Sequence, residues 1–161
     1  MLLTFKRLRE GAKIPVRATE ASAGMDLSAS LTEPVEIPPH AIRLIPTGLA
    51  AAPARSDVML MLCARSGLAS KHGIGMANGV GIVDADYRGE ICVPLINQSE
   101  VPFTVTDGLR IAQMIVVPVI LPEIAESIDV IYGQLKKGGR LTPAAAHRNR
   151  PSRASDAPRA E

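Results

Sequence analysis

The sequence predicts an all-β fold, either a compact β-barrel or a jelly-roll-like domain, with one short helical turn. Short apolar runs are separated by turns rich in Pro, Gly, Asn and Asp, at the spacing expected of strands. The 13 prolines and 13 glycines among 161 residues suit strands and turns better than helices. Several runs, such as Met59–Leu62, are continuously apolar, as expected for strands covered on both faces.

Each predicted strand is a short apolar run, and most of these runs are bounded by turn residues. In chain order they are Leu2–Phe5, Met25–Ser28, Val35–Ile37, Ile42–Ile45, Val58–Cys63, Gly81–Val83, Ile91–Ile96, Phe103–Val105 and Ile111–Ile120. Pro94 and Pro118 interrupt two of these runs, and proline cannot donate to a strand ladder. We therefore expect edges or bulges at these two positions.

The predicted helical turn follows the strand that ends near Cys63. Ser66 is a suitable N-cap, and Gly73 is a suitable residue to end the turn. The start of such a turn offers free backbone N–H groups and a partial positive charge, Arg65 adds a bidentate donor, and Gly67 permits close approach. Together they indicate a cradle for an oxyanion or phosphate. An ordinary capped surface turn is the alternative.

A glycine-punctuated hairpin, Asn78–Glu90, follows the helical turn. Asn78 and Gly79 form a strong turn signal. The segment then places two carboxylates, Asp84 and Asp86, close to Tyr87. A hairpin with a purely structural role has little reason to contain this combination of residues. A polar, exposed loop edge is the alternative interpretation.

Composition excludes several classes of function. Aromatic residues are only 2% of the chain and tryptophan is absent, which disfavours binding of single-stranded nucleic acid by base stacking. No apolar run approaches the ~18 residues that span a bilayer, and charged residues interrupt the N-terminus. Neither the cysteines nor the histidines show zinc-ligand spacing, and Cys63 and Cys92 are expected to be small core residues. These features predict a cytoplasmic protein with no membrane partner and no specific nucleic-acid binding.

The C-terminal segment differs in composition from the rest. It is rich in Ala, Pro, Ser and Arg, carries a net positive charge, and has few large apolar residues to offset the entropy of ordering. We expect a β domain at 1–135 and a disordered basic tail at 136–161. The tail is predicted to be a solvated end rather than a nucleic-acid contact.

Two further segments carry polar residues into apolar strands: Asp26 follows Gly24 in the first, and Arg110 and Gln113 lie in the second. A buried arginine or glutamine would need a partner there, unless Arg110 stays in solvent at the strand entrance. Taken in order with the turn and the hairpin, these segments resemble the four central motifs of the homotrimeric dUTPase (deoxyuridine triphosphate nucleotidohydrolase) family. The matching stretches are AGMDLSA at 23–29, ARSGLASKHGI at 64–74, NGVGIVDADYRGE at 78–90 and GLRIAQMIVVPV at 108–119.

The resemblance implies Mg²⁺-dependent hydrolysis of dUTP to dUMP and pyrophosphate. It also implies that Asp84 activates a water molecule, which then attacks the phosphate in line. The family further implies a homotrimer with active sites between subunits. An aspartate with an ordinary pKa of ~3.9 is a weak base, but it is ionised at neutral pH.

The same resemblance implies roles for the other motif residues. Tyr87 would pack under the sugar and exclude a 2′-hydroxyl, Gln113 would reach a phosphate, and Asp26 would hold Mg²⁺ indirectly through water or brace the site. Arg65, Ser66 and Gly67 would bind phosphates. The uracil pocket would consist of the side chain of Asn78 and the backbone of Ile82, Val83 and Cys92.

The chain departs from the family pattern at its C-terminal end. The fifth motif is degenerate, because Leu135 stands where an arginine is expected, Arg140 stands where a stacking aromatic is expected, and no phenylalanine follows Phe103. This departure leaves an alternative open, a nucleotide-binding regulator of the same fold with little turnover. A dCTP deaminase of the same fold ranks lower, because the hairpin and the Arg-Ser-Gly turn resemble dUTPase more closely.

Overall fold

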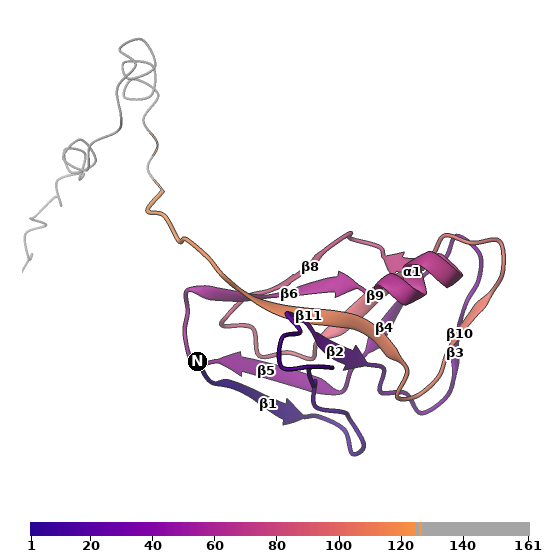
Figure 1. The fold of residues 1–161 in the computed structure, drawn as a ribbon, viewed down its shortest axis with the longest axis horizontal. Helices are drawn as coiled ribbons and strands as arrows, with labels where there is room; N and C mark the ends of the chain where they lie inside the picture. Colours follow the sequence, from indigo (N-terminus) through magenta and orange to yellow (C-terminus); the bar gives the residue numbers. More distant parts are fainter. Residues whose placement is uncertain (125, 127–161) are drawn as a thin grey trace, which may run out of the picture. The chain divides into compact units, whose positions relative to one another are not determined.

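The computed structural model describes residues 1–124 and 126, and the named elements all lie in one unit, Met1–Ile120 (Figure 1). The strands are β1 (Leu3–Arg7), β2 (Met25–Ser28), β3 (Val35–Ile37), β4 (Ile42–Pro46), β5 (Leu49–Pro53), β6 (Val58–Ala64), β7 (Ile74–Met76), β8 (Gly81–Val83), β9 (Cys92–Asn97), β10 (Phe103–Val105) and β11 (Arg110–Pro118), and the helix is α1 (Ser66–His72). The predicted all-β class with one helical turn is confirmed. The predicted boundary at 135 and the basic tail at 136–161 lie outside the described residues.

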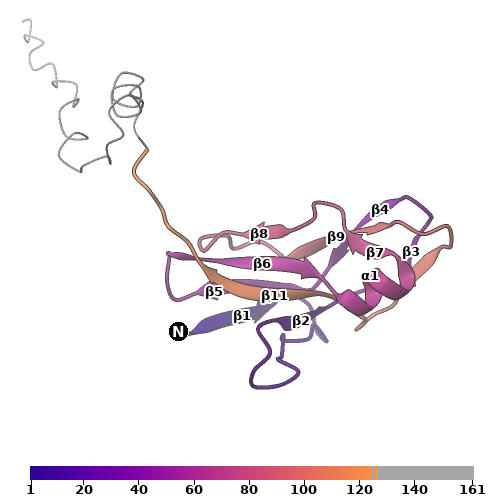
Figure 2. The same cartoon turned by 45° about the horizontal axis from the view of Figure 1, so that its top comes forward.

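The strands form four small antiparallel sheets within the described part of the chain. Their orders are β2-β11-β6-β8, β4-β9-β7, β1-β5 and β3-β10. These sheets do not close into a barrel, so the jelly-roll-like prediction is the one that holds. Figures 1 and 2 show α1 at one end of this unit, beside β3 and β10. There the ring of His72 lies 5.4 Å from that of Phe103, centroid to centroid.

The core lies between the sheets and consists mainly of aliphatic side chains. Alternation along β6 and β9 directs every second residue inward, which is the period expected of strands. Fully buried residues include Leu27, Ile37, Ile45, Leu60, Val93, Leu95, Ile111 and Met114. Burial of such side chains stabilises a fold by about 1.5–3 kcal/mol each, which explains why a chain with two phenylalanines and no tryptophan still has a packed interior.

Asn97 is a buried polar residue, and both the nitrogen and the oxygen of its side-chain amide have hydrogen-bond partners. Its amide nitrogen donates to the carbonyls of Ile37 (3.0 Å) and Val101 (2.7 Å), and its oxygen accepts the N–H and the hydroxyl of Ser99. Asn97 therefore ties the end of β9 to β3 without leaving an unpaired group.

The prolines lie where strand pairing ends. Pro94 pairs with Leu44 of β4, and the ladder between β9 and β7 stops at the next residue, Leu95. Pro118 is the last residue of β11, beyond the part of that strand that pairs with β2. Both positions are local edges, as expected.

Among the described residues, no helix combines the length and the apolar character that crossing a bilayer requires.

Gly48 connects β4 to β5 and gives a testable packing prediction. Its φ is +68°, and a Cβ there would lie 2.8 Å from both the Cβ of Ala12 and the Oγ of Ser30. Gly48→Ala is expected to lower the free energy of unfolding by about 2–4 kcal/mol, because backbone strain adds to overpacking. Gly11 is the control, since its φ is +82° but no atom lies within 4 Å of the added Cβ. Gly11→Ala should cost only about 1 kcal/mol in urea denaturation. Equal losses would contradict the packing argument.

Candidate active site

Arg65 lies at the junction of β6 and α1. It occupies the N-cap position in an extended conformation (φ −85°, ψ 127°), and its side chain makes no capping hydrogen bond to the helix. The prediction that Ser66 is the N-cap is therefore wrong, because the helix already begins at Ser66. Ser66 and Gly67 form the exposed first turn, and the first intrahelical bond of the turn runs from the N–H of Ala69 to the carbonyl of Arg65 (3.0 Å). The earlier N–H groups of this turn are open to a ligand. The predicted end of the turn is confirmed, since Gly73 has φ +66°.

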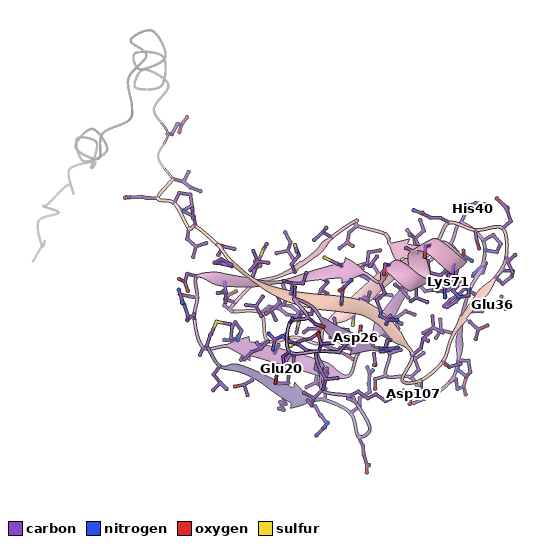
Figure 3. All side chains as sticks on the ribbon, in the orientation of Figure 1. Glu20, Asp26, Glu36, His40, Lys71 and Asp107 are labelled. Carbon is purple, nitrogen blue, oxygen red and sulfur yellow. The ribbon has the colours of Figure 1, made fainter. Side chains whose placement is uncertain are left out.

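Asp26 brings two arginines together at this end of the sheet. The Nε of Arg65 donates to its Oδ1 (2.9 Å), and Nη1 of Arg110 donates to its Oδ2 (2.9 Å). Figure 3 labels Asp26, which lies on β2. The pairing of β2 with β11, and of β11 with β6, places these residues on neighbouring strands. We call Asp26, Arg65, Arg110 and Gln113 the arginine cluster.

Gln113 completes the cluster from β11. It lies opposite Asp26 on one side and Cys63 on the other, and its Nε2 donates to the carbonyl of Ala64 (3.1 Å). A Cβ on Gly24 would lie 2.7 Å from the Oε1 of Gln113. The absence of a side chain at Gly24 therefore makes room for Gln113, and this is the physical reason for a glycine before β2.

The hairpin Asn78–Glu90 has a different position in the sheet. Within the described residues, its strand β8 pairs with β6 alone, so β8 is an edge strand there, with unpaired backbone groups along its outer side. Ile82 on this strand is 63% exposed. After Val83 the chain turns, and the N–H of Tyr87 donates to the carbonyl of Asp84 (3.2 Å). Asp84 is exposed at the start of this turn, and Asn78 is exposed at the other end of β8.

Tyr87 is held by the turn that follows it. Its hydroxyl donates to the carbonyl of Glu90 (3.1 Å), and a Cβ on Gly89 would lie only 2.4 Å from that hydroxyl oxygen. The ring therefore folds back over Gly89, with one side open, since Tyr87 is 45% exposed. Glu90 in turn accepts the N–H of Gly48 (2.8 Å) and pairs with Arg9 (2.9 Å). Glu90 therefore connects the hairpin to Gly48 and Arg9, and no local sequence pattern predicted this role.

Cys92 begins β9, where it pairs with Pro46. Burial raises the pKa of the Cys92 thiol, and the negative charge of Glu90 adds to this increase. The thiol thus stays protonated at neutral pH and behaves as a small apolar side chain. The expected contribution of the Cys92 backbone to the site stays a prediction.

The described chain does not bring the two halves of the predicted site together. Val83 pairs with Leu60, so Asp84 and Arg65 lie at opposite ends of β6, about 20 Å apart at ~3.3 Å per residue. Asp26 lies three strands from β8 in the order β2-β11-β6-β8, which is roughly 14 Å across the sheet at ~4.8 Å per strand. In Figure 2, β6 runs toward α1, and β8 lies beside the middle of β6, with Val83 opposite Leu60.

The arginine cluster contains one residue that the sequence did not place in the site. The sequence leaves two environments open for Arg110, a buried position with a partner and a solvent-exposed position at the entrance of the strand. In the structure its side chain is 58% exposed and is nevertheless paired with Asp26. The signal available in the sequence was the arginine itself, three residues before Gln113 at the start of an apolar strand.

Among the described residues, no group of three or more His, Cys, Asp and Glu side chains lies close enough to hold a metal ion. Asp26 is the acidic member of the arginine cluster, and Asp84 and Asp86 lie on the hairpin turn. A divalent ion here would take most of its ligands from a bound anion and water, which is how Mg²⁺ commonly binds beside phosphates.

Comparison with known proteins gives a consistent result. A family model described as dUTPase matches residues 10–140. A deoxyuridine 5'-triphosphate nucleotidohydrolase of Desulfitobacterium hafniense (strain DSM 10664 / DCB-2) is 48% identical over 129 residues, which cover 79% of this chain and 85% of that protein. The protein of the same name from Maricaulis maris (strain MCS10) is 52% identical over 125 residues, covering 74% of this chain and 81% of the relative.

Solved structures show the same fold at lower identity. A mutant dUTPase from phage phi11 of S. aureus, whose structure describes the coordination of a structural Mg(II) ion, has a TM-score of 0.72 at 22% identity. The match covers 80% of this chain and 98% of the phage protein. At this identity the likeness concerns the fold alone, and it supports the jelly-roll-like description.

Proposed function

The chain belongs to the dUTPase family and hydrolyses dUTP to dUMP and pyrophosphate, and from this premise we propose how its residues carry the reaction. Asp84 acts as the general base that deprotonates the attacking water. Arg65, Ser66, Gly67 and Gln113 bind the phosphates. The observation that carries this assignment is the division of the motif residues into an arginine cluster suited to anions and an exposed carboxylate turn.

The uracil end of the substrate is proposed to bind along the hairpin. Among the described residues, the outer edge of β8 has no strand partner. We propose that backbone groups at Ile82 and Val83 copy the donor and acceptor pattern of a base. Asn78 and the backbone of Cys92 complete this pocket. Thymine's methyl group would clash in such a backbone pocket, and cytosine would present the wrong edge.

The separation of the two clusters supports a site shared between copies of the chain. A general base must lie within hydrogen-bond reach of the attacking water, at ~2.6–3.2 Å. One triphosphate must therefore contact Asp84 and the arginine cluster together, although within one chain they lie about 20 Å apart. A homotrimer, the assembly implied by the family resemblance, would bring the hairpin of one copy to the cluster of another.

Mg²⁺ is proposed to bind the triphosphate, where it would neutralise charge that develops on the phosphate oxygens. The residues present fit an ion that arrives with the substrate, since one carboxylate, Asp26, lies beside the phosphate-binding groups. The indirect role of Asp26, through water ligands of the ion, stays a prediction. The cytoplasmic location likewise stays a prediction.

Two alternatives are not favoured. The relatives are named as nucleotidohydrolases, which supports turnover over a purely regulatory nucleotide-binding protein and over a dCTP deaminase. The degenerate fifth motif, on which the regulatory alternative rested, lies outside the described residues. Pyrophosphate release from dUTP, with dCTP and UTP as controls, tests the proposal. Ammonia release from dCTP would contradict it.

Discrimination against UTP gives a prediction for the hairpin. If the ring of Tyr87 packs under the sugar and leaves no space for a 2′-hydroxyl, Tyr87→Ala should lower the ratio of kcat/KM for dUTP to that for UTP by about tenfold or more. Gly89→Ala should act in the same direction, because its Cβ would lie 2.4 Å from the hydroxyl oxygen of Tyr87 and displace the ring. Steady-state kinetics with both nucleotides measures the ratio. An unchanged ratio in Tyr87→Ala would remove this role.

A further inference from the structure

Asp26 is the centre of a charge cluster in which both carboxylate oxygens are already engaged. Oδ1 accepts from Arg65 and Oδ2 from Arg110, each at 2.9 Å, and the Asp26 side chain is only 20% exposed. Arg65 also donates from Nη1 to the carbonyl of Arg110 (3.3 Å). One carboxylate therefore fixes two guanidinium groups side by side, with a net positive charge.

Arg110 reaches this position through an irregularity in β11. Arg110 pairs with Ser28, whereas Ala112 pairs with Leu27, so the register shifts between Arg110 and Ala112. A bulge of this kind changes the direction of a side chain, and bulges are frequent beside active sites. The backbone thus departs from regular pairing at the residue that meets Asp26.

Both guanidinium groups keep donors for a further acceptor. An arginine has five N–H donors in a planar fork. Within the described residues Arg110 uses one of its nitrogens, Nη1, and Arg65 uses two, Nε and Nη1. The Arg110 side chain is 58% exposed and that of Arg65 is 24% exposed. A pair of such forks, held together and partly accessible, matches the geometry and charge of phosphate oxygens.

We propose that Asp26 is a positioning residue that aligns Arg65 and Arg110 as a two-arginine clamp, and that Arg110 contacts a phosphate of dUTP. This inference rests on the proposed function of the cluster and adds Arg110 to the phosphate-binding residues. The carboxylate acts through the arginines, because both of its oxygens accept from them. In Asp26→Asn the amide oxygen can accept from one arginine, while the amide nitrogen faces the other.

Binding without a metal tests the clamp. The dissociation constant of the non-hydrolysable analogue dUpNHpp, measured by calorimetry in EDTA, is expected to rise about tenfold or more in Asp26→Asn and in Arg110→Gln. The double variant should bind little worse than Asp26→Asn alone, because the two changes remove the same alignment. Glu100→Gln is the control, a carboxylate-to-amide change in an exposed pair with His40, and it should bind as the wild type does.

Several outcomes would overturn the clamp. An unchanged dissociation constant in EDTA for Asp26→Asn, with a raised Mg²⁺ requirement for turnover, would assign Asp26 to the water shell of the ion instead. If the fold-increases in the dissociation constant of the two single variants multiply in the double variant, Asp26 and Arg110 act independently, and Asp26 does not position Arg110. Arg110→Gln changes an exposed side chain, so it keeps the test valid if Asp26→Asn folds poorly. Failure of the proposed function is distinguishable, because the wild type itself would then neither bind dUpNHpp nor hydrolyse dUTP.

Discussion

Asp84→Asn is expected to lower the single-turnover rate of dUTP hydrolysis by about 10²–10⁴-fold, which corresponds to about 3–5 kcal/mol of transition-state stabilisation. The amide keeps the size of the side chain but cannot take a proton from water. The affinity for dUTP should change little, because the phosphates and the base are bound by other groups. Rapid-quench measurement of pyrophosphate release, with enzyme in excess over dUTP, isolates this step from product release.

Asp86→Asn is the matched control for this experiment. Asp86 lies two residues later in the same turn, is also exposed, and has no proposed part in the reaction. It should keep a rate close to that of the wild type. Equal losses in the two variants would indicate a general effect of negative charge on the turn, and an unchanged rate in Asp84→Asn would remove the general-base assignment.

The second large effect is expected when two inactive variants are mixed. Asp84→Asn and Arg65→Gln should each have little activity as pure oligomers. If each site takes Asp84 from one copy and Arg65 from another, random one-to-one mixing restores both residues in about a quarter of the sites. The activity should therefore rise far above the sum of the two pure preparations after the variants are unfolded and refolded together.

Mixing without exchange of subunits supplies the control. The two variants, combined after each has assembled separately, should show only their summed residual activity. If co-refolding also gives no more than this sum, Asp84 and Arg65 must serve the same site from one chain. That result would contradict the shared site, and the separation of about 20 Å along β6 would then have to close by a rearrangement of the hairpin.

The strands that the sequence predicted most accurately are those with local apolar runs between turn residues. The bounds of β2, β3, β8 and β10 agree with the predicted segments, and the other predicted runs differ by one or two residues at most of their ends. Two strands were missed. Leu49–Pro53 is mainly alanine, and Ile74–Met76 contains a glycine, so neither has a local β signal; both are strands because β1 and β9, respectively, pair with them.

The sequence by itself determined the family resemblance and predicted which residues would carry the chemistry, since each motif is a short local segment and its residue types limit what it can bind. Only the tertiary structure decided which of them meet. Asp26 lies 39 residues from Arg65 and 84 from Arg110 along the chain, and antiparallel pairing of β2, β11 and β6 brings their charges within 2.9 Å. The pairing of β8 with β6 places Asp84, which directly follows β8, near the end of β6 that is far from Arg65. No local pattern contains strand order or register, because these follow from burying the apolar faces of distant segments together.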